Sequence, residues 1–479
     1  MSPREEEEDI TAYYFERRRP SITKKTTSDT IIANEDLELH SIKDKDSDTE
    51  TMHNGTTDTD NNGISSAVEF SLPPVDTGLN AYLVLVAGFL IEGFVWGFPF
   101  SYSVMQQHYQ QLPEFHDASI TELALVGTLT SGMAYVGGAI VGLLGGRFSL
   151  KTMMYTGSLI MGISLIGASF ATRPWHLILC QGFLLGLGGS FLYNSFMAFV
   201  PMYWYKYRGL ATGFVFTGAG IFGLAFPIIM EKALKGIGFR WTLRIVAILV
   251  LVICLGSSII VRPRYTPDAT APSKKFSLSK NDFKFLTTKK FMILGFSVLF
   301  QSLGYFIPNL FIQPYALSIG VSEQNAVNLV SILNAMTIVG QLFIGHICDR
   351  FGYAGAITLS SAVSALSTFF LWRFSGTSYS ILLAYTILYS IFGSGYTTCF
   401  PSMIYDVAES DYNKFTMING SFMLLRGVGN IAGIPIGSIF LSATSSITNG
   451  WYDITYFVGS ALVASAIFGA MRQFLIKPR

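Results

Sequence analysis

The sequence predicts an all-α membrane protein with twelve transmembrane helices in two six-helix halves. Past residue 80 the chain carries twelve apolar stretches that are long enough to cross a hydrocarbon core of roughly 30 Å, which takes about 20 helical residues. Half of the residues are hydrophobic and 13% are charged, whereas about a quarter of a soluble domain is charged. The third observation is an internal repeat between the halves, described below.

The expected spans follow from the apolar stretches and the charged connections between them. They are 81–105, 121–145, 152–172, 176–200, 208–230, 240–261, 290–313, 324–345, 354–374, 378–401, 414–441 and 451–472. The longest connection separates the first six spans from the last six. The chain therefore divides into a tail at 1–75, an N-terminal half at 76–261, a cytosolic linker at 262–289 and a C-terminal half at 290–479.

Residues 1–75 have the composition of a disordered cytosolic tail. The first 70 residues hold 17 acidic and 8 basic side chains and few large apolar ones, so burial cannot offset the entropy cost of ordering. No apolar core of the signal-peptide kind occurs there, and the first span is expected to act as the insertion signal. The run from Arg17 to Ser21 suits a basic-directed kinase acting on Ser21, although a solvated charge run is the favoured interpretation.

The distribution of Lys and Arg predicts the orientation, because cytosolic connections of membrane proteins are enriched in both. One set of alternate connections, together with the C-terminus, holds 17 of these residues, and the opposite set holds 5. Both termini are therefore expected in the cytosol, with the lipid bilayer of the plasma membrane around the spans.

Several function classes find no support in the sequence. The four cysteines stand singly in or beside apolar segments, so neither a disulfide framework nor a metal site is expected. The chain also lacks a catalytic constellation, a P-loop and a nucleic-acid-binding surface. We therefore expect no enzyme, no cofactor and no nucleotide-driven pump.

The two halves repeat at an offset of 203 residues. Gly142-Leu-Leu-Gly-Gly-Arg-Phe-Ser149 follows the second span, and Gly345-His-Ile-Cys-Asp-Arg-Phe-Gly352 follows the eighth. A six-plus-six duplication with an Asp-Arg-aromatic-Gly turn resembles the major facilitator superfamily over about residues 80–475. The resemblance implies two halves that rock about a midplane site and expose it to each side in turn. It also implies a gating motif made of Arg147, Asp349, Arg350 and Gly352, with Gly146 where the superfamily prefers Asp.

Two further stretches resemble the monocarboxylate-porter family, particularly its fungal members. Asp76-Thr-Gly78 leads into the first span, and Tyr203-Trp-Tyr-Lys-Tyr-Arg-Gly-Leu-Ala-Thr-Gly213 enters the fifth. Animal carboxylate carriers of this family use a Lys in helix 1 and an Asp and an Arg in helix 8. Phe100, Thr337 and Gln341 stand at these positions here. The resemblance therefore implies a transporter of this type without the charges of the animal mechanism.

Glu92 and Arg426 are each the only charge deep in their spans. A charge at the bilayer midplane costs about 2.5–3.5 kcal/mol on insertion scales, so neither is expected to face lipid. A guanidinium forms two-pronged contacts with anionic groups, which makes Arg426 the expected anion-binding residue. Glu92 is the expected proton carrier. A structural ion pair or a packing role is the competing interpretation for both.

Helical periodicity places other polar and aromatic side chains beside these charges. In the superfamily fold, helices 1, 4, 7 and 10 line the cavity, with 2, 5, 8 and 11 beside them. Hydrogen bonding between helices is the competing explanation for several of these side chains. The expected substrate-binding residues are Arg426, Trp96, Phe100, Gln301, Tyr305, Asn309, Asn334, Gln341, Tyr389, Tyr396 and Asn419.

These observations predict a secondary active transporter, similar to monocarboxylate porters, that moves a small organic anion by alternating access. Symport with protons follows if Glu92 is the proton carrier. A carrier of a neutral or vitamin-like solute is the first alternative, and a nutrient sensor that signals through the tail is the second. Saturable uptake that persists after deletion of residues 1–70 would separate a carrier from a sensor.

Overall fold

The computed structural model describes residues 76–115, 118–145, 147–264, 280–409, 412–443 and 447–475. The predicted tail with its kinase site at Ser21 lies outside the described residues, as does most of the linker between the halves.

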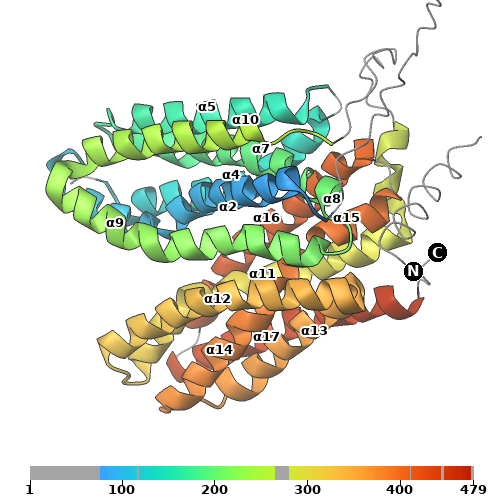
Figure 1. Ribbon diagram of the computed structural model, residues 1–479. Helices are drawn as coiled ribbons and strands as arrows, with labels where there is room; N and C mark the ends of the chain where they lie inside the picture. The colour runs from blue at the N-terminus through green and yellow to red at the C-terminus, as the bar shows by residue number, and fades with distance from the viewer. Residues whose placement is uncertain are drawn as a thin grey trace, which may run out of the picture. The chain divides into compact units, whose positions relative to one another are not determined.

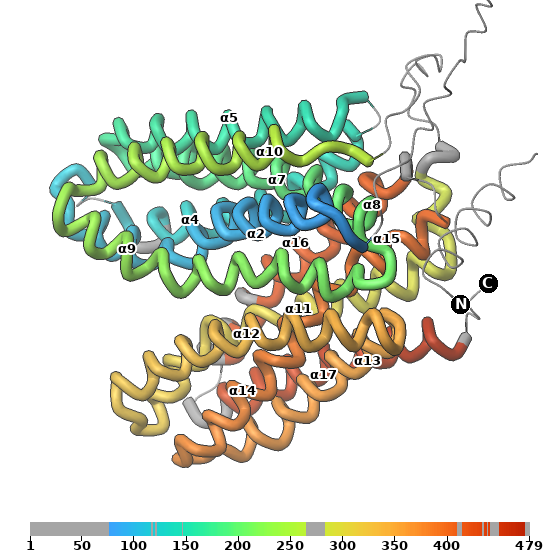
Figure 2. The backbone as a smooth tube through the Cα atoms, in the orientation of Figure 1, coloured from blue at the N-terminus to red at the C-terminus, as the bar shows by residue number. Residues whose placement is uncertain are grey.

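The first half is built from helices that form one group in Figures 1 and 2, coloured from blue to green. Gly238 has a φ of 75°, a backbone conformation that favours glycine. It bends α9 sharply, so this element holds the predicted fifth span and the first part of the sixth, which continues through η3 and α10. The elements are α2 (Leu79–Phe100), α3 (Tyr102–Gln110), η1 (Pro113–Phe115), α4 (Ile120–Leu144), α5 (Leu150–Ala168), α6 (Pro174–Leu177), η2 (Ile178–Leu184), α7 (Leu185–Phe196), α8 (Val200–Tyr203), α9 (Arg208–Val250), η3 (Leu251–Leu255) and α10 (Gly256–Ile260).

The second half forms the other group, coloured from yellow to red. Side-chain caps mark helix starts: Thr288 accepts a hydrogen bond from the backbone N–H of Phe291 at the start of α11, which satisfies one of the free donors there. The elements are η4 (Lys280–Thr287), α11 (Lys289–Ser318), α12 (Glu323–Phe351), α13 (Tyr353–Leu366), η5 (Ser367–Trp372), α14 (Tyr379–Gly395), η6 (Tyr396–Cys399), α15 (Phe400–Ala408), α16 (Tyr412–Ala443) and α17 (Ile447–Leu475).

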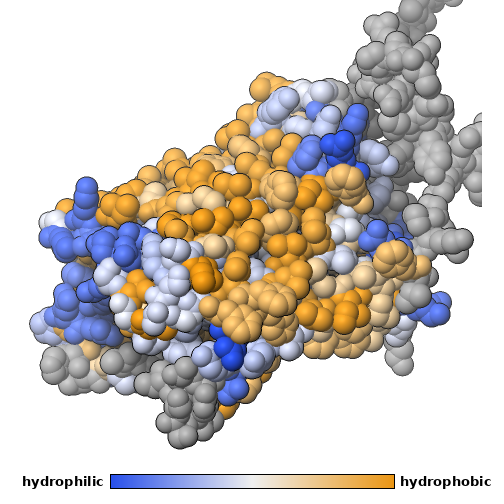
Figure 3. Space-filling view, turned by 90° about the horizontal axis from the view of Figure 1, so that it is seen from below, coloured by the Kyte–Doolittle hydropathy of each residue, from blue (hydrophilic) through white to orange (hydrophobic). Residues whose placement is uncertain are grey.

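The predicted all-helical membrane fold is confirmed. Among the described residues, eight helices are long and apolar enough to cross a membrane. One of them, Arg208–Ile260, contains two of the predicted spans, and the full number of twelve stays a prediction. On the face shown in Figure 3, hydrophobic residues form a band between two more hydrophilic ends, as expected for a bilayer.

Glycines allow the helices of the two halves to approach closely. A Cβ on Gly209 of α9 would stand 2.5 Å from the carbonyl oxygen of Gly345 on α12, and a Cβ on Gly420 of α16 would overlap the carbonyl oxygen of Gly138 on α4. These contacts lie toward the ends of the helices that carry the 2–3 and 8–9 connections, here called the expected cytosolic end. Small residues at such crossings bring two backbones into contact.

The substitution Gly420→Ala is expected to lower the melting temperature of the purified protein, because α16 must move away from α4 to make room for the methyl group. Gly256→Ala is the matched control, since no heavy atom lies within 4 Å of its added Cβ. The control should leave the melting temperature unchanged or raise it slightly. Equal melting temperatures for the two variants would contradict the proposed close contact.

A cluster of charges joins four helices of the second half at the expected cytosolic end. The carboxylate of Asp406 accepts hydrogen bonds from Tyr353 Oη at 2.6 Å, from Arg472 Nη2 at 2.7 Å and from Lys290 Nζ at 3.2 Å. Burial acts to raise the pKa of Asp406. The hydrogen bonds from Tyr353 and Arg472 and the charges of Arg472 and Lys290 outweigh it and lower that pKa below its ordinary value.

Acid is expected to destabilise the protein in part through Asp406. A carboxyl whose pKa is lowered by folding contributes stability above its unfolded pKa of about 3.9, and this stability is lost as the pH falls further. Asp406→Asn should lower the melting temperature at pH 7 and flatten its decline between about pH 5 and pH 3. Melting curves across this range test both effects. A variant with the wild-type acid dependence would show that other groups cause it.

Candidate functional site

Arg426 lies between the two halves, on a face of α16 that neighbouring glycines define. Gly427 packs against Tyr135 of α4, and Gly429 packs against Ser302 of α11. At 100° per residue, Arg426 falls between these two contact faces. Its side chain is 3% exposed. The guanidinium therefore occupies the wedge between α4 of the first half and α11 of the second.

The surroundings of this guanidinium are mostly aromatic. Its central carbon lies 5.1 Å from the ring centre of Tyr305 and 5.6 Å from those of Tyr135 and Phe400. Nη1 donates a hydrogen bond to Gln301 Oε1 at 3.2 Å. A guanidinium has five N–H donors and keeps its charge at any working pH. Among the described residues, its hydrogen-bond partners are the Gln301 amide and the Tyr135 side chain, which is fewer than its five donors can engage.

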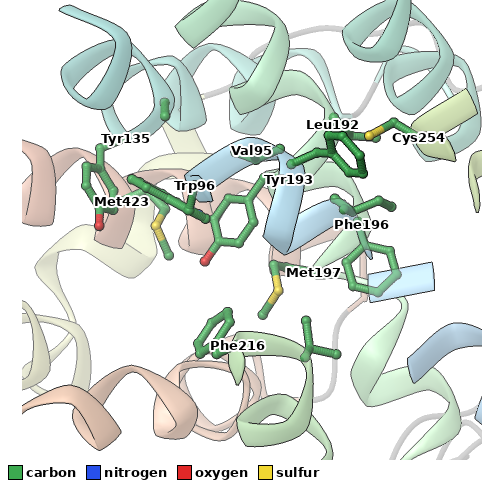
Figure 4. Packing of buried hydrophobic residues seen from close by; sticks show 14 of the residues in the cluster. Val95, Trp96, Tyr135, Leu192, Tyr193, Phe196, Met197, Phe216, Cys254 and Met423 are labelled. Carbon is green, nitrogen blue, oxygen red and sulfur yellow. The ribbon is translucent and has the colours of Figure 1, made fainter. Parts of the chain in front are cut away.

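Glu92 of α2 lies close enough to Arg426 for their charges to interact. It is 5% exposed, and its Oε2 has no hydrogen-bond partner among the described residues. The charge of Arg426 acts on it, but their atoms do not come within the 4.0 Å of an ion pair. The two residues therefore do not form a direct ion pair in this conformation. One turn along α2, the centre of the Trp96 ring lies 4.6 Å from that of Tyr135 and 6.0 Å from that of Tyr193. Figure 4 shows these three side chains close to one another.

A pair of amides lies nearer the expected cytosolic end of the same wedge. Asn419 Nδ2 of α16 donates to Asn194 Oδ1 of α7 at 3.1 Å. Asn194 in turn donates to the carbonyl oxygen of Ser190 at 3.0 Å. Both asparagines are almost fully buried. This contact links the two halves directly and must break if they separate on that side.

Other predicted site residues form hydrogen bonds within or between helices. The Tyr389 hydroxyl donates to the backbone oxygen of Tyr305 at 3.0 Å and so holds α14 to α11. The hydroxyls of Tyr396 and Ser297 lie 2.9 Å apart within the second half. Asn309 donates to the backbone oxygen of Tyr305 at 3.4 Å. These hydrogen bonds match the competing explanation given for such side chains, namely bonding within and between helices.

Three more predicted residues lie around the wedge, and their side chains form fewer hydrogen bonds or ring contacts. Phe100 is 44% exposed, and its ring centre lies 6.3 Å from that of Trp96. Gln341 is buried, and its Oε1 has no hydrogen-bond partner among the described residues. Asn334 is half-buried on α12, where its backbone oxygen faces Gly220 of α9.

Sequence reasoning missed Tyr135, Tyr193 and Asn194. Asn194 is the only asparagine in the predicted fourth span, so the rule that selected Asn419 would also have found it. No comparable signal marks the two tyrosines, because aromatic residues are common throughout the spans. Their place beside Glu92 and Arg426 depends on how α4 and α7 pack.

One member of the predicted gating motif joins the two halves. Asp349 at the end of α12 accepts hydrogen bonds from the backbone N–H groups of Gly209 at 2.6 Å and Leu210 at 2.8 Å. A carboxylate at a helix N-terminus satisfies free donors and complements the helix dipole. The recorded contacts of Arg147 and Arg350 are with the rings of the phenylalanines that follow them. Gly352 has a φ of 83° and is the N-cap residue that precedes α13.

The two stretches that resemble the porter family also meet at this helix start. The carboxylate of Asp76 accepts hydrogen bonds from the backbone N–H groups of Tyr205, Lys206 and Tyr207 at 3.0–3.2 Å. Asp76 thereby holds the segment that leads into α9, and Asp349 of the other half caps the N–H groups of Gly209 and Leu210.

Comparison with known proteins decides the family. The model of the Major Facilitator Superfamily matches residues 84–434 and 294–478. The chain belongs to this superfamily. The predicted superfamily fold is confirmed, and the finer resemblance to monocarboxylate porters stays a prediction.

The curated relatives of this superfamily member include fungal transporters. The MFS-type transporter pynF of Aspergillus niger is 28% identical over 409 residues, covering 85% of this chain and 92% of the relative. The Agnestins efflux protein AgnL12 of Paecilomyces divaricatus is 26% identical over 406 residues, covering 85% and 90%. The superfamily member described here is therefore an integral membrane transporter.

Solved structures show the same fold at low identity. The human organic anion transporter MFSD10 (TETRAN) matches with a TM-score of 0.66 and 11% identity, covering 81% of this chain and 100% of that one. The transporter FucP in its outward conformation matches with a TM-score of 0.62 and 13% identity, covering 82% and 99%. Transporters of this superfamily bind small molecules in the membrane, near the interface of their two halves.

Proposed function

We propose that this superfamily member is a secondary active transporter that moves a small organic anion by alternating access, with Arg426 as the anion-binding group. The observation that carries the proposal is the enclosed guanidinium, whose hydrogen-bond partners among the described residues are two neutral side chains, Gln301 and Tyr135. A buried charge without acceptors is costly, and an anion with two oxygens would satisfy several of its remaining donors.

The position of Arg426 supports a role in transport over a role in packing alone. It contacts Tyr135 of the first half and both Tyr305 and Phe400 of the second. A ligand held here would touch both halves, and its binding energy can therefore favour one arrangement of the halves over another. Two curated relatives are named efflux proteins, for agnestins and fujikurins, which favours export as the direction.

Arg426→Gln is expected to weaken transport of organic anions by about 10- to 100-fold, because hydrogen bonds to a charged group are worth about 1.5–3 kcal/mol. Counterflow into proteoliposomes, run with a panel of organic acids and neutral solutes, measures the effect. Arg426→Lys should also be impaired, since the charge remains but the planar two-pronged contact is lost.

The matched control for these variants is Arg173→Gln, an exposed arginine in a connection of the first half. It should transport like the wild type. Normal anion transport by Arg426→Gln would refute the anion site. A carrier of neutral solutes would then lead, a role that the uncharged Phe100, Thr337 and Gln341 at the family's charged positions already suit.

Glu92 is the proposed proton site. It is a buried carboxyl that lies beside the anion site and has one oxygen without a partner. Glu92→Gln should abolish transport driven by a pH gradient and preserve exchange of substrate for substrate, because exchange requires no deprotonation. Both modes can be measured in the same proteoliposomes, since a secondary transporter runs in whichever direction the imposed gradient favours.

Glu323→Gln is the control for Glu92, because Glu323 is an exposed acidic residue at the start of α12. It should keep both modes of transport. A Glu92→Gln variant whose transport follows the pH gradient as in the wild type would remove Glu92 from the coupling mechanism.

A further inference from the structure

Asn430 lies on the same face of α16 as Arg426. Four residues on one helix are separated by 400°, so their side chains point within about 40° of each other. Ile431, which faces Gly132 of α4, and Gly433, which faces Leu303 of α11, flank it as Gly427 and Gly429 flank Arg426. The wedge that holds the guanidinium therefore continues along α16 to Asn430. Asn430 lies about one helical turn beyond Arg426, on the side away from Asn419.

The amide of Asn430 is buried and has no partner. The residue is 6% exposed, and neither Oδ1 nor Nδ2 forms a hydrogen bond among the described residues. The other amides close to Arg426 differ in this respect: Gln301 accepts from Arg426, and Asn419 donates to Asn194. A buried amide without partners costs free energy, so a native structure that retains one requires an explanation.

The geometry points to Asn430 as a second, specificity-determining contact of the transported anion. This inference rests on the proposed function, in which Arg426 holds the anionic group. We propose that the amide of Asn430 binds a hydroxyl or carbonyl group at the other end of the same molecule. An amide donates through Nδ2 and accepts through Oδ1, so it can bind either group.

The spacing along α16 indicates the size of the ligand. A rise of 1.5 Å per residue separates the two backbone positions by about 6 Å along the helix axis. A carboxylate and a para hydroxyl on one benzene ring are a comparable distance apart. The rings of Tyr135, Tyr305 and Trp96 line the region near Arg426, and offset stacking on such rings suits a planar ligand. The class inferred is therefore an aromatic acid with a polar group para to its carboxylate.

A pair of probes that differ by one hydroxyl tests the inference, namely 4-hydroxybenzoate and benzoate. Their binding to the purified full-length protein is measured by calorimetry. The wild type should bind 4-hydroxybenzoate about 5- to 10-fold more tightly, because one hydrogen bond contributes about 1 kcal/mol or slightly more. Asn430→Leu should bind both acids equally, with its affinity for benzoate within about twofold of wild type. Asn328→Leu, in a distant and more exposed part of α12, should keep the preference.

Equal binding of both acids by the wild type, or no binding of either, overturns the inference. A preference that survives in Asn430→Leu also overturns it and indicates that the amide binds water only. If the Leu variant does not fold, Asn430→Ala is judged by the same ratio of affinities. Arg426→Gln reports on the proposed function separately, since it should weaken both acids by the same factor, and unchanged binding of both would refute the anion site alone.

Discussion

The enclosed charge of Arg426 is the constraint on which the site depends. A guanidinium cannot lose its proton at a working pH, and removing it from water is costly unless acceptors replace the water. Gln301 and the faces of three aromatic rings supply part of that compensation. These side chains come from α4, α11 and α15, so residues of both halves contact the same guanidinium. Some N–H donors of Arg426 remain without an acceptor among the described residues, whereas in a structural ion pair a carboxylate would accept from them.

The contacts between the halves are of a kind that can be made and broken repeatedly. Backbone approaches at Gly138–Gly420 and Gly209–Gly345 require no side-chain rearrangement. The hydrogen bonds that cross the interface, from Gly209 and Leu210 to Asp349 and from Asn419 to Asn194, contribute about 0.5–1.5 kcal/mol each when neutral and somewhat more when charged. A few such bonds hold one arrangement of the halves without making it permanent.

The two copies of the internal repeat are not equivalent at this interface. Asp349 caps the start of α9, whereas the position 203 residues earlier is Gly146, which has no carboxylate to offer to α16. The two halves also differ in charge within their helices: α16 carries the buried Arg426, whereas the buried Gln341 of α12 is neutral. A fold built from inward-facing helices permits such exchanges, because several helices reach the same midplane region and function depends on the site rather than on the fold.

The sequence by itself determined the helical membrane fold, the superfamily and the presence of two charges that avoid lipid, Glu92 and Arg426. These depend on composition, on motifs, on the length of apolar stretches and on the cost of a buried charge. It also placed polar side chains such as Asn419 beside Arg426, since helical periodicity is a local property. Only the tertiary structure decided that Glu92 and Arg426 do not form an ion pair. It also decided that Tyr135 and Tyr193 lie beside these two charges. The hydroxyls of Tyr389 and Tyr396 form hydrogen bonds to a neighbouring helix, which the sequence does not show either. Each of these findings depends on distances between helices that are far apart in the chain. Packing at small residues such as Gly138 and Gly420 sets those distances, and the periodicity of a single helix does not encode that packing.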